Sequence, residues 1–185
     1  MYNFTPSEMF FARKFANDVA GNIDENDFKD SRNVSRTQSK VIEDNIKGKL
    51  AEILVYNLIG NKDAEMDFNI YEKGIGDGFD IVVNGLSIDV KASTMRSKWL
   101  MFEERTAKGW AKPPDYMCLV GIEGDKGEYL FGSDIKTIRK NCQLIERGSN
   151  IPNTQVPMKA SNFMVNKASS FDSSHIVQYF NQGEK

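Results

Sequence analysis

Apolar side chains recur at helical spacing in the first third of the chain. Aromatic residues predict a first helix over residues 6–19, and a loop is expected to follow it. A second helix is predicted from a cap at Ser39 to a stop at Gly60. Its apolar stripe consists of Ile46, Leu50, Ile53, Leu54 and Leu58. A helix with such a stripe is expected to lie against a sheet or another helix.

Alternating apolar positions predict strands in the middle of the chain. The segment 63–91 is interpreted as strands, with Asn84-Gly85 between two alternating runs as the strongest local hairpin signal. Residues 116–122 and 128–132 predict a further strand pair, joined through residues 124–127. Residues 92–114 show no clear period and are interpreted as a loop or a broken helix. The C-terminal 40 residues give the weakest pattern.

A last helix is predicted to start at a Ser133 or Asp134 cap. Its inward residues would be Ile135, Ile138, Cys142 and Ile145. The order of helix, strands and helix predicts an α/β fold, with a central mixed β-sheet flanked by helices.

Composition restricts the class of protein. A length of 185 residues, with 40% apolar and 27% charged residues, is typical of one globular domain. No apolar run is long enough for a membrane span, and the N-terminus has no signal-peptide pattern, so a cytoplasmic protein without a membrane partner is expected. Cys118 and Cys142 are then expected to be reduced. The single histidine, His175, excludes catalysis by paired histidines, and two cysteines exclude a four-cysteine iron–sulfur site.

The net charge of −2 conceals an uneven distribution. Residues 63–90 contain seven acids and one lysine, whereas residues 91–113 contain six bases and two acids. Alternating solvated faces would explain this as well as a functional site would. Any hydrolytic chemistry must depend on carboxylates, lysine and a hard metal ion.

The hairpin brings two aspartates together. An Asn84-Gly85 turn would place Asp80 opposite Asp89, with Lys91 on the same face of the strand as Asp89. Like charges at directly opposed positions destabilise a strand pair, and a divalent cation between them would remove the repulsion. The alternatives are a solvated edge hairpin and a surface ion pair between Asp89 and Lys91.

Glu52 is the third candidate carboxylate. It shares a second helix face with Gly48, which leaves space one turn away, and with the apolar Val55, Tyr56 and Ile59. A buried carboxylate is costly unless it is paired or bound to a metal. The alternatives are a salt bridge to Lys49 or Lys91 and exposure at the helix end, and together with the hairpin the pattern favours a site.

Glu52 on a helix, Asp80 opening a strand and Asp89-Val90-Lys91 closing the next strand resemble the PD-(D/E)XK nuclease superfamily. The resemblance covers residues ~45–95, and Phe79 stands where the family motif has proline. It implies a single nuclease domain over residues 1–185 with a restriction-endonuclease-like core. The catalytic part would be about 40–145, and residues 1–38 and 146–185 would be elaborations that vary within the family.

The resemblance also implies roles for these residues. Asp80, Asp89 and the Val90 carbonyl would ligate Mg²⁺, for which Mn²⁺ would substitute. Lys91 would position the attacking water, and Glu52 would bind a second metal ion or a metal-bound water. The implied activity is Mg²⁺-dependent hydrolysis of DNA phosphodiester bonds.

Basic and aromatic residues after Lys91, and the hydroxyl residues just past it, are candidates for contacts to nucleic acid. They are Ser93, Thr94, Arg96, Lys98, Trp110 and Lys112. A homodimer is expected only because one small site needs a second copy to cut both strands. Two alternatives stay open: a nuclease selective for junctions, flaps or RNA, and a non-catalytic nucleic-acid-binding module that has kept the fold.

Overall fold

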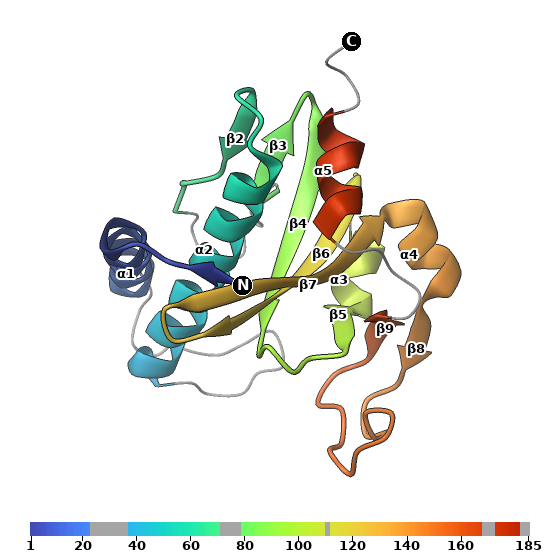
Figure 1. Ribbon diagram of the computed structural model, residues 1–185. Helices are drawn as coiled ribbons and strands as arrows, with labels where there is room; N and C mark the ends of the chain where they lie inside the picture. The colour runs from blue at the N-terminus through green and yellow to red at the C-terminus, as the bar shows by residue number, and fades with distance from the viewer. Residues whose placement is uncertain (23–36, 71–78, 110–111, 168–172, 182–185) are drawn as a thin grey trace.

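The computed structural model describes residues 1–22, 37–70, 79–109, 112–167 and 173–181. They form a mixed α/β fold around a curled six-stranded sheet (Figure 1). The strands of this main sheet follow the order β1-β7-β6-β4-β3-β2. Their bounds are Tyr2–Asn3 for β1, Ala64–Met66 for β2, Ile81–Val83 for β3, Leu86–Ser93 for β4, Tyr116–Glu123 for β6 and Lys126–Asp134 for β7.

The main sheet is mixed because β4 and β6 run parallel, whereas the other neighbouring strands are antiparallel. A smaller antiparallel sheet has the order β5-β9-β8, with β5 at Trp99–Glu103, β8 at Gln143–Ile145 and β9 at Asn162–Asn166. The strand β5 and the short helix α3 (Glu104–Gly109) lie within residues 92–114, so the prediction of a loop or broken helix there was wrong for the strand. Pairing with the distant strand β9 stabilises β5, which has no clear local pattern.

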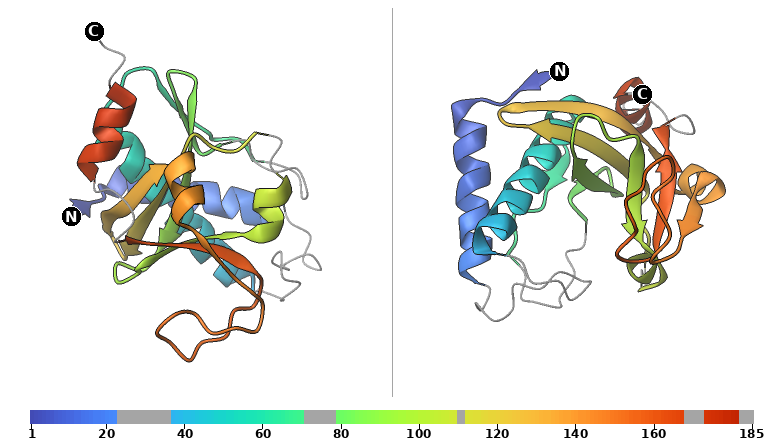
Figure 2. Two further views of the ribbon diagram at one scale, coloured as in Figure 1. Left: turned by 90° about the vertical axis from the view of Figure 1, so that its right-hand side faces the viewer. Right: turned by 90° about the horizontal axis from the view of Figure 1, so that it is seen from below.

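Two N-terminal helices lie side by side at the edge of the molecule (Figure 2). The first, α1 (Pro6–Gly21), begins at a Thr5 capping box and turns Ala12, Ala16 and Ala20 inward. These small residues, one turn apart, allow close approach to α2 (Gln38–Ile59). The prediction of a helix over 6–19 is confirmed.

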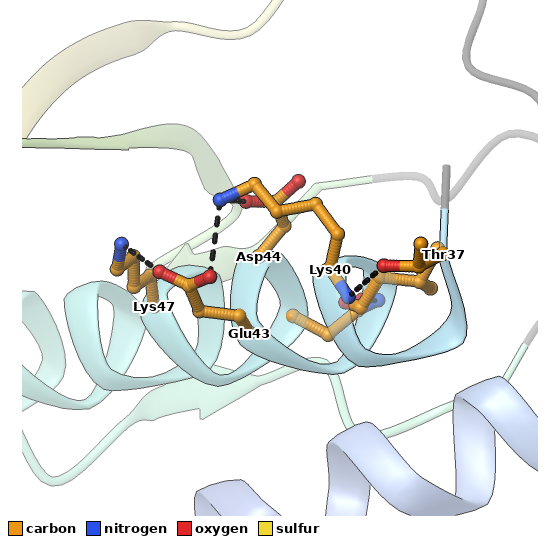
Figure 3. Close-up of polar contacts among 7 residues, drawn as sticks. Thr37, Lys40, Glu43, Asp44 and Lys47 are labelled. Carbon is orange, nitrogen blue, oxygen red and sulfur yellow. Dashed lines mark hydrogen bonds and ion pairs between the residues drawn. The ribbon is translucent and has the colours of Figure 1, made fainter. Parts of the chain in front are cut away.

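The limits of α2 confirm one prediction and correct another. Gly60 ends the helix in a left-handed conformation, as predicted. The N-cap is Thr37 and not Ser39, because the Thr37 hydroxyl accepts the Lys40 backbone N–H at 3.2 Å (Figure 3). Ser39 lies inside the first turn.

Side-chain alternation on β6 divides the core into two parts. Tyr116, Cys118 and Val120 pack with α2 and with the C-terminal helix α5 (Ser173–Asn181). Met117 and Leu119 pack on the opposite face, with apolar residues of the smaller sheet and of α4 (Ile135–Asn141). The main sheet therefore has helices on one face and the small sheet with α4 on the other.

The helix α4 is shorter than predicted. Asp134 is its N-cap, as one of the two alternatives proposed, and Ile138 is buried. Cys142 ends the helix in an extended conformation, and Ile145 belongs to β8. The prediction that Cys142 and Ile145 continue the helix was wrong because this segment pairs with β9. No helix in the described part of the chain is long and apolar enough to cross a membrane.

Candidate active site

The β3–β4 hairpin carries most of the candidate residues. Its turn is Asn84-Gly85, with φ values of 52° and 76° respectively, as a type I′ turn requires. Val83 pairs with Leu86 and Ile81 with Ile88, as the sequence predicts. Because this register alternates faces, Ile88 and Val90 lie in the core with α2, and Asp89 and Lys91 belong to the other face of β4.

Asp80 lies just beyond the last pair of this ladder. Its backbone N–H donates to the Ile88 carbonyl at 3.2 Å. Its Oδ2 accepts the Val90 N–H at 2.6 Å, so the side chain of Asp80 is tied to the strand that carries Asp89. The predicted Asp80–Asp89 ladder pair is therefore replaced by a side-chain contact one residue further along.

The charges of Asp89, Glu52 and Lys91 all affect the pKa of Asp80. Burial raises the pKa of Asp80 well above its usual value, and the carboxylates of Asp89 and Glu52 raise it further. Lys91 and the Val90 N–H act in the opposite direction. Three carboxylates and one lysine thus interact around one half-buried position.

Lys91 is paired within this group. Its Nζ lies 2.6 Å from Asp89 Oδ1, and its side chain is 40% exposed against 17% for Asp89. The ion pair considered in the sequence analysis is thus present. It holds the ammonium group beside the carboxylates and leaves part of the lysine in contact with solvent.

Glu52 reaches the group from α2. Its Oε2 lies 2.5 Å from Nζ of Lys49, which is almost fully buried. Lys49 also donates to the Asp67 carbonyl at 2.8 Å and lies 4.1 Å from the centre of the Phe15 ring. Lys49 therefore compensates the charge of Glu52, which is the salt-bridge alternative from the sequence.

The donor set can be tested against Mg²⁺. Among the residues that the structure describes, no three Asp, Glu, His or Cys side chains form a group that could hold a metal ion. Proteins commonly bind Mg²⁺ through one or two carboxylates, and water and substrate oxygens complete the shell. Asp80 and Asp89 are two such carboxylates, and the charge of Asp89 acts on Asp80. These residues fit a magnesium ion bound together with a phosphate, not one enclosed by the protein alone.

The predicted nucleic-acid contacts are only partly near these carboxylates. Arg96 and Lys98 are exposed in the turn after β4. The Nζ atom of Lys112 lies 5.9 Å from the ring centre of Phe79, the neighbour of Asp80. Ser93 ends β4, and Thr94 lines a different pocket with Arg13. Trp110 lies outside the described residues.

A pocket beside the carboxylates includes residues that the sequence analysis did not single out. This α1–α2 pocket has a volume of about 320 Å³ and is shared by the two helices and the segment after β2. Its lining consists of Phe15, Val19, Asp44, Asn45, Gly48, Lys49, Glu52, Asp67, Asn69, Ile70 and Asp80. A Cβ atom at Gly48 would meet nothing within 4 Å, so the space predicted there is confirmed.

Comparison with known proteins adds no relative. The chain matches no family model, no curated protein sequence and no solved structure. The residues and their arrangement are therefore the only guide to function.

Proposed function

We propose that this chain is a Mg²⁺-dependent endodeoxyribonuclease with a restriction-endonuclease-like core. The observation that carries the proposal is the grouping of Asp80, Asp89 and Lys91 on one hairpin, with Glu52 close enough to affect Asp80. A carboxylate pair with a neighbouring lysine is suited to phosphodiester hydrolysis with a hard metal ion. The order α2, β3–β4 hairpin and β6, with β6 parallel to β4, is compatible with such a core.

The chain's own residues would divide the chemical work. Asp80 and Asp89 would hold the ion, together with the Val90 carbonyl, and Glu52 would hold a second ion or a bound water. When bound, Mg²⁺ supplies an activated water and screens the charge of the phosphate. The Lys91 ammonium would orient the water and stabilise the negative charge that develops on the phosphate. The ion pair of Lys91 with Asp89, with Nζ and Oδ1 2.6 Å apart, supports this role.

The partners proposed are DNA and a second copy of the chain. Exposed Arg96 and Lys98 follow β4 in the chain, and Lys112 lies 5.9 Å from the ring centre of Phe79, the neighbour of Asp80. Such residues suit phosphate contacts. A homodimer would supply two sites for two strands.

The test is cleavage of supercoiled plasmid with Mg²⁺ or Mn²⁺. Asp89→Asn and Lys91→Ala should each reduce the rate by at least about 100-fold, because they remove a ligand and a charge stabiliser respectively. Asp125→Asn and Lys126→Ala make the same changes at exposed positions of the β6–β7 turn and should cut at the wild-type rate. Undiminished cutting by the hairpin variants would refute the site.

A panel of substrates separates the remaining alternatives. Discrete bands from a long duplex would indicate sequence-specific cutting, whereas selective cleavage of flaps, junctions or RNA would indicate a structure-selective nuclease. DNA binding without hydrolysis of any form, in Mg²⁺ or Mn²⁺, would favour the non-catalytic module.

A further inference from the structure

The α1–α2 pocket lies next to the candidate catalytic residues. Glu52 and Asp80 belong to both, so a group bound in the pocket would lie beside the bond that the proposed site acts on. The pocket has a volume of about 320 Å³, which falls within the range of small-ligand sites. The following inference rests on the proposed function.

The charges of the lining disfavour a phosphate inside the pocket. Four carboxylates line it, against the single ammonium of Lys49, which is already paired with Glu52. Asp44 at its wall is paired with Lys40 at 3.1 Å (Figure 3). Carboxylate and amide oxygens accept hydrogen bonds, so a neutral ligand with N–H groups suits this lining better than an anion.

Flat aromatic surfaces accompany these acceptors. Phe15 and Val19 form an apolar wall on α1. Phe68, adjacent in the chain to the lining residues Asp67 and Asn69, is 54% exposed. Its ring contacts that of Phe11 on α1 edge-to-face, with ring centres 5.3 Å apart. Exposed aromatic rings beside a polar pocket suit the stacking and edge contacts of nucleobases.

We infer that the α1–α2 pocket receives an unpaired nucleobase of the DNA strand whose phosphodiester bond lies at Asp80 and Asp89. A base in the pocket presents exocyclic and ring N–H groups to oxygens of Asp67, Asn45 and Asn69, where Asp67 Oδ1 already accepts from Asn69. Its flat face lies against the exposed ring of Phe68. Its phosphate stays outside, on the side of Lys91. The preferred substrate is then DNA with an unpaired nucleotide at the cleavage position, as in a single strand, a flap or an extruded base.

Binding of a labelled single-stranded 12-mer, followed by fluorescence anisotropy with Ca²⁺, tests this inference. One abasic nucleotide is moved through the oligonucleotide, position by position. One position, or two adjacent ones, should weaken binding by about tenfold, because a single stacked base contributes on this scale. Equal affinity for all the abasic oligonucleotides would overturn the inference, and this comparison needs only the wild-type protein.

A filled pocket provides the second comparison. Gly48→Leu places a side chain in open space on the pocket wall and should weaken binding of the intact 12-mer by about tenfold. The oligonucleotide that is abasic at the sensitive position should bind Gly48→Leu and wild type equally. Gly21→Leu, at an exposed glycine at the end of α1 with equally open space, is the matched control and should bind like wild type.

The outcomes distinguish this inference from the proposed function. Mg²⁺-dependent cleavage of continuous duplex, unaffected by Gly48→Leu and by abasic positions, would overturn the base pocket and leave the nuclease intact. Base-dependent binding without cleavage would support the base pocket and contradict the proposed nuclease activity. Displacement of the 12-mer by free arginine, with no abasic effect, would assign the pocket to a cationic side chain and overturn the inference.

Discussion

Asp80 is the residue at which the proposed function and the stability of the fold conflict. Burial and the neighbouring Asp89 and Glu52 carboxylates raise its pKa, so its charged form destabilises the metal-free fold. A raised folded pKa means that stability falls as pH rises from the unfolded pKa through the folded one. Asp80→Asn should remove this loss while keeping an acceptor for the Val90 N–H.

The Asp80→Asn protein, at pH 8 in EDTA, is therefore predicted to melt above wild type. The shift should be about 2–4 °C for each kcal/mol of repulsion removed, measured by differential scanning calorimetry. Below pH 4 the two proteins should converge, because Asp80 is then protonated. A lower melting temperature at pH 8 would contradict the proposed repulsion between Asp80 and its neighbouring carboxylates, provided that the exposed control Asp125→Asn melts like wild type.

Lys49 makes the opposite contribution, because it is a buried charge that its neighbours compensate. Its partners are Glu52, the Asp67 carbonyl and the Phe15 ring. Lys49→Met leaves Glu52 mostly buried without this partner and should cost about 3–5 kcal/mol in the free energy of unfolding, measured by urea titration. The double variant Lys49→Met, Glu52→Met should recover most of this loss. A single variant as stable as wild type would show that the pair is not important for stability.

At this scale the sequence identifies residues whose chemistry is evident from local spacing. Asp80, Asp89 and Lys91 follow from one hairpin register, and Glu52 from helical periodicity. The burial of Lys49 does not, because it depends on Phe15 from one helix and Asp67 from a later segment. A lysine among charged neighbours is usually solvated, so its position depends on tertiary contacts.

At the scale of elements, local signals succeed where one segment determines its own conformation. The Asn84-Gly85 turn fixes the β3–β4 register, and Gly60 fixes the end of α2. The strand β5 and the early end of α4 depend on β9, which follows both in the sequence. Strand pairing between segments far apart in the sequence cannot be predicted from a local hydrophobic pattern.

Asp134 provides an element-scale test with a defined pH dependence. Partial burial acts to raise the pKa of its carboxyl, but hydrogen bonds from Thr137, Lys136 and Ser133 outweigh burial and lower it. A carboxyl whose pKa is lower in the folded than in the unfolded protein stabilises the fold at pH values above its unfolded pKa. This stability is lost as the pH falls through the folded pKa.

We predict that Asp134→Ala lowers the free energy of unfolding by about 0.5–2 kcal/mol at pH 7, because α4 loses its N-cap. The difference from wild type should shrink below pH 4. Urea titrations at pH 7 and pH 3 measure both values, and Asp134→Asn, which keeps a capping oxygen without the charge, should lie between Asp134→Ala and wild type at pH 7. An equal loss at both pH values would contradict the role of the carboxylate charge.

At the scale of the whole molecule, the main sheet separates two cores and carries the candidate residues Asp89 and Lys91 on β4, with Asp80 directly before β3. The chain segments with acidic and basic excess meet at Lys91, so the small net charge results from adjacent opposite charges and not from a neutral surface. This arrangement allows a carboxylate site and phosphate-binding residues to adjoin each other.

The proposed double-strand cutting also predicts the assembly state. Light scattering after size exclusion should give twice the 20.9 kDa chain mass at micromolar concentration without DNA, and that mass plus the mass of the bound DNA in the complex. A monomer in both conditions would restrict the proposed activity to single-strand cutting, which the unpaired-base pocket accommodates.

The most direct test of the account combines activity with stability in one variant. Purified wild-type protein and Asp80→Asn are each incubated with supercoiled plasmid and Mg²⁺, and their melting temperatures are recorded in EDTA. We predict that the wild type cuts the plasmid, whereas Asp80→Asn is folded, melts higher and does not cut. A wild-type protein inert in both Mg²⁺ and Mn²⁺, or an Asp80→Asn protein that cuts at the wild-type rate, would contradict this prediction.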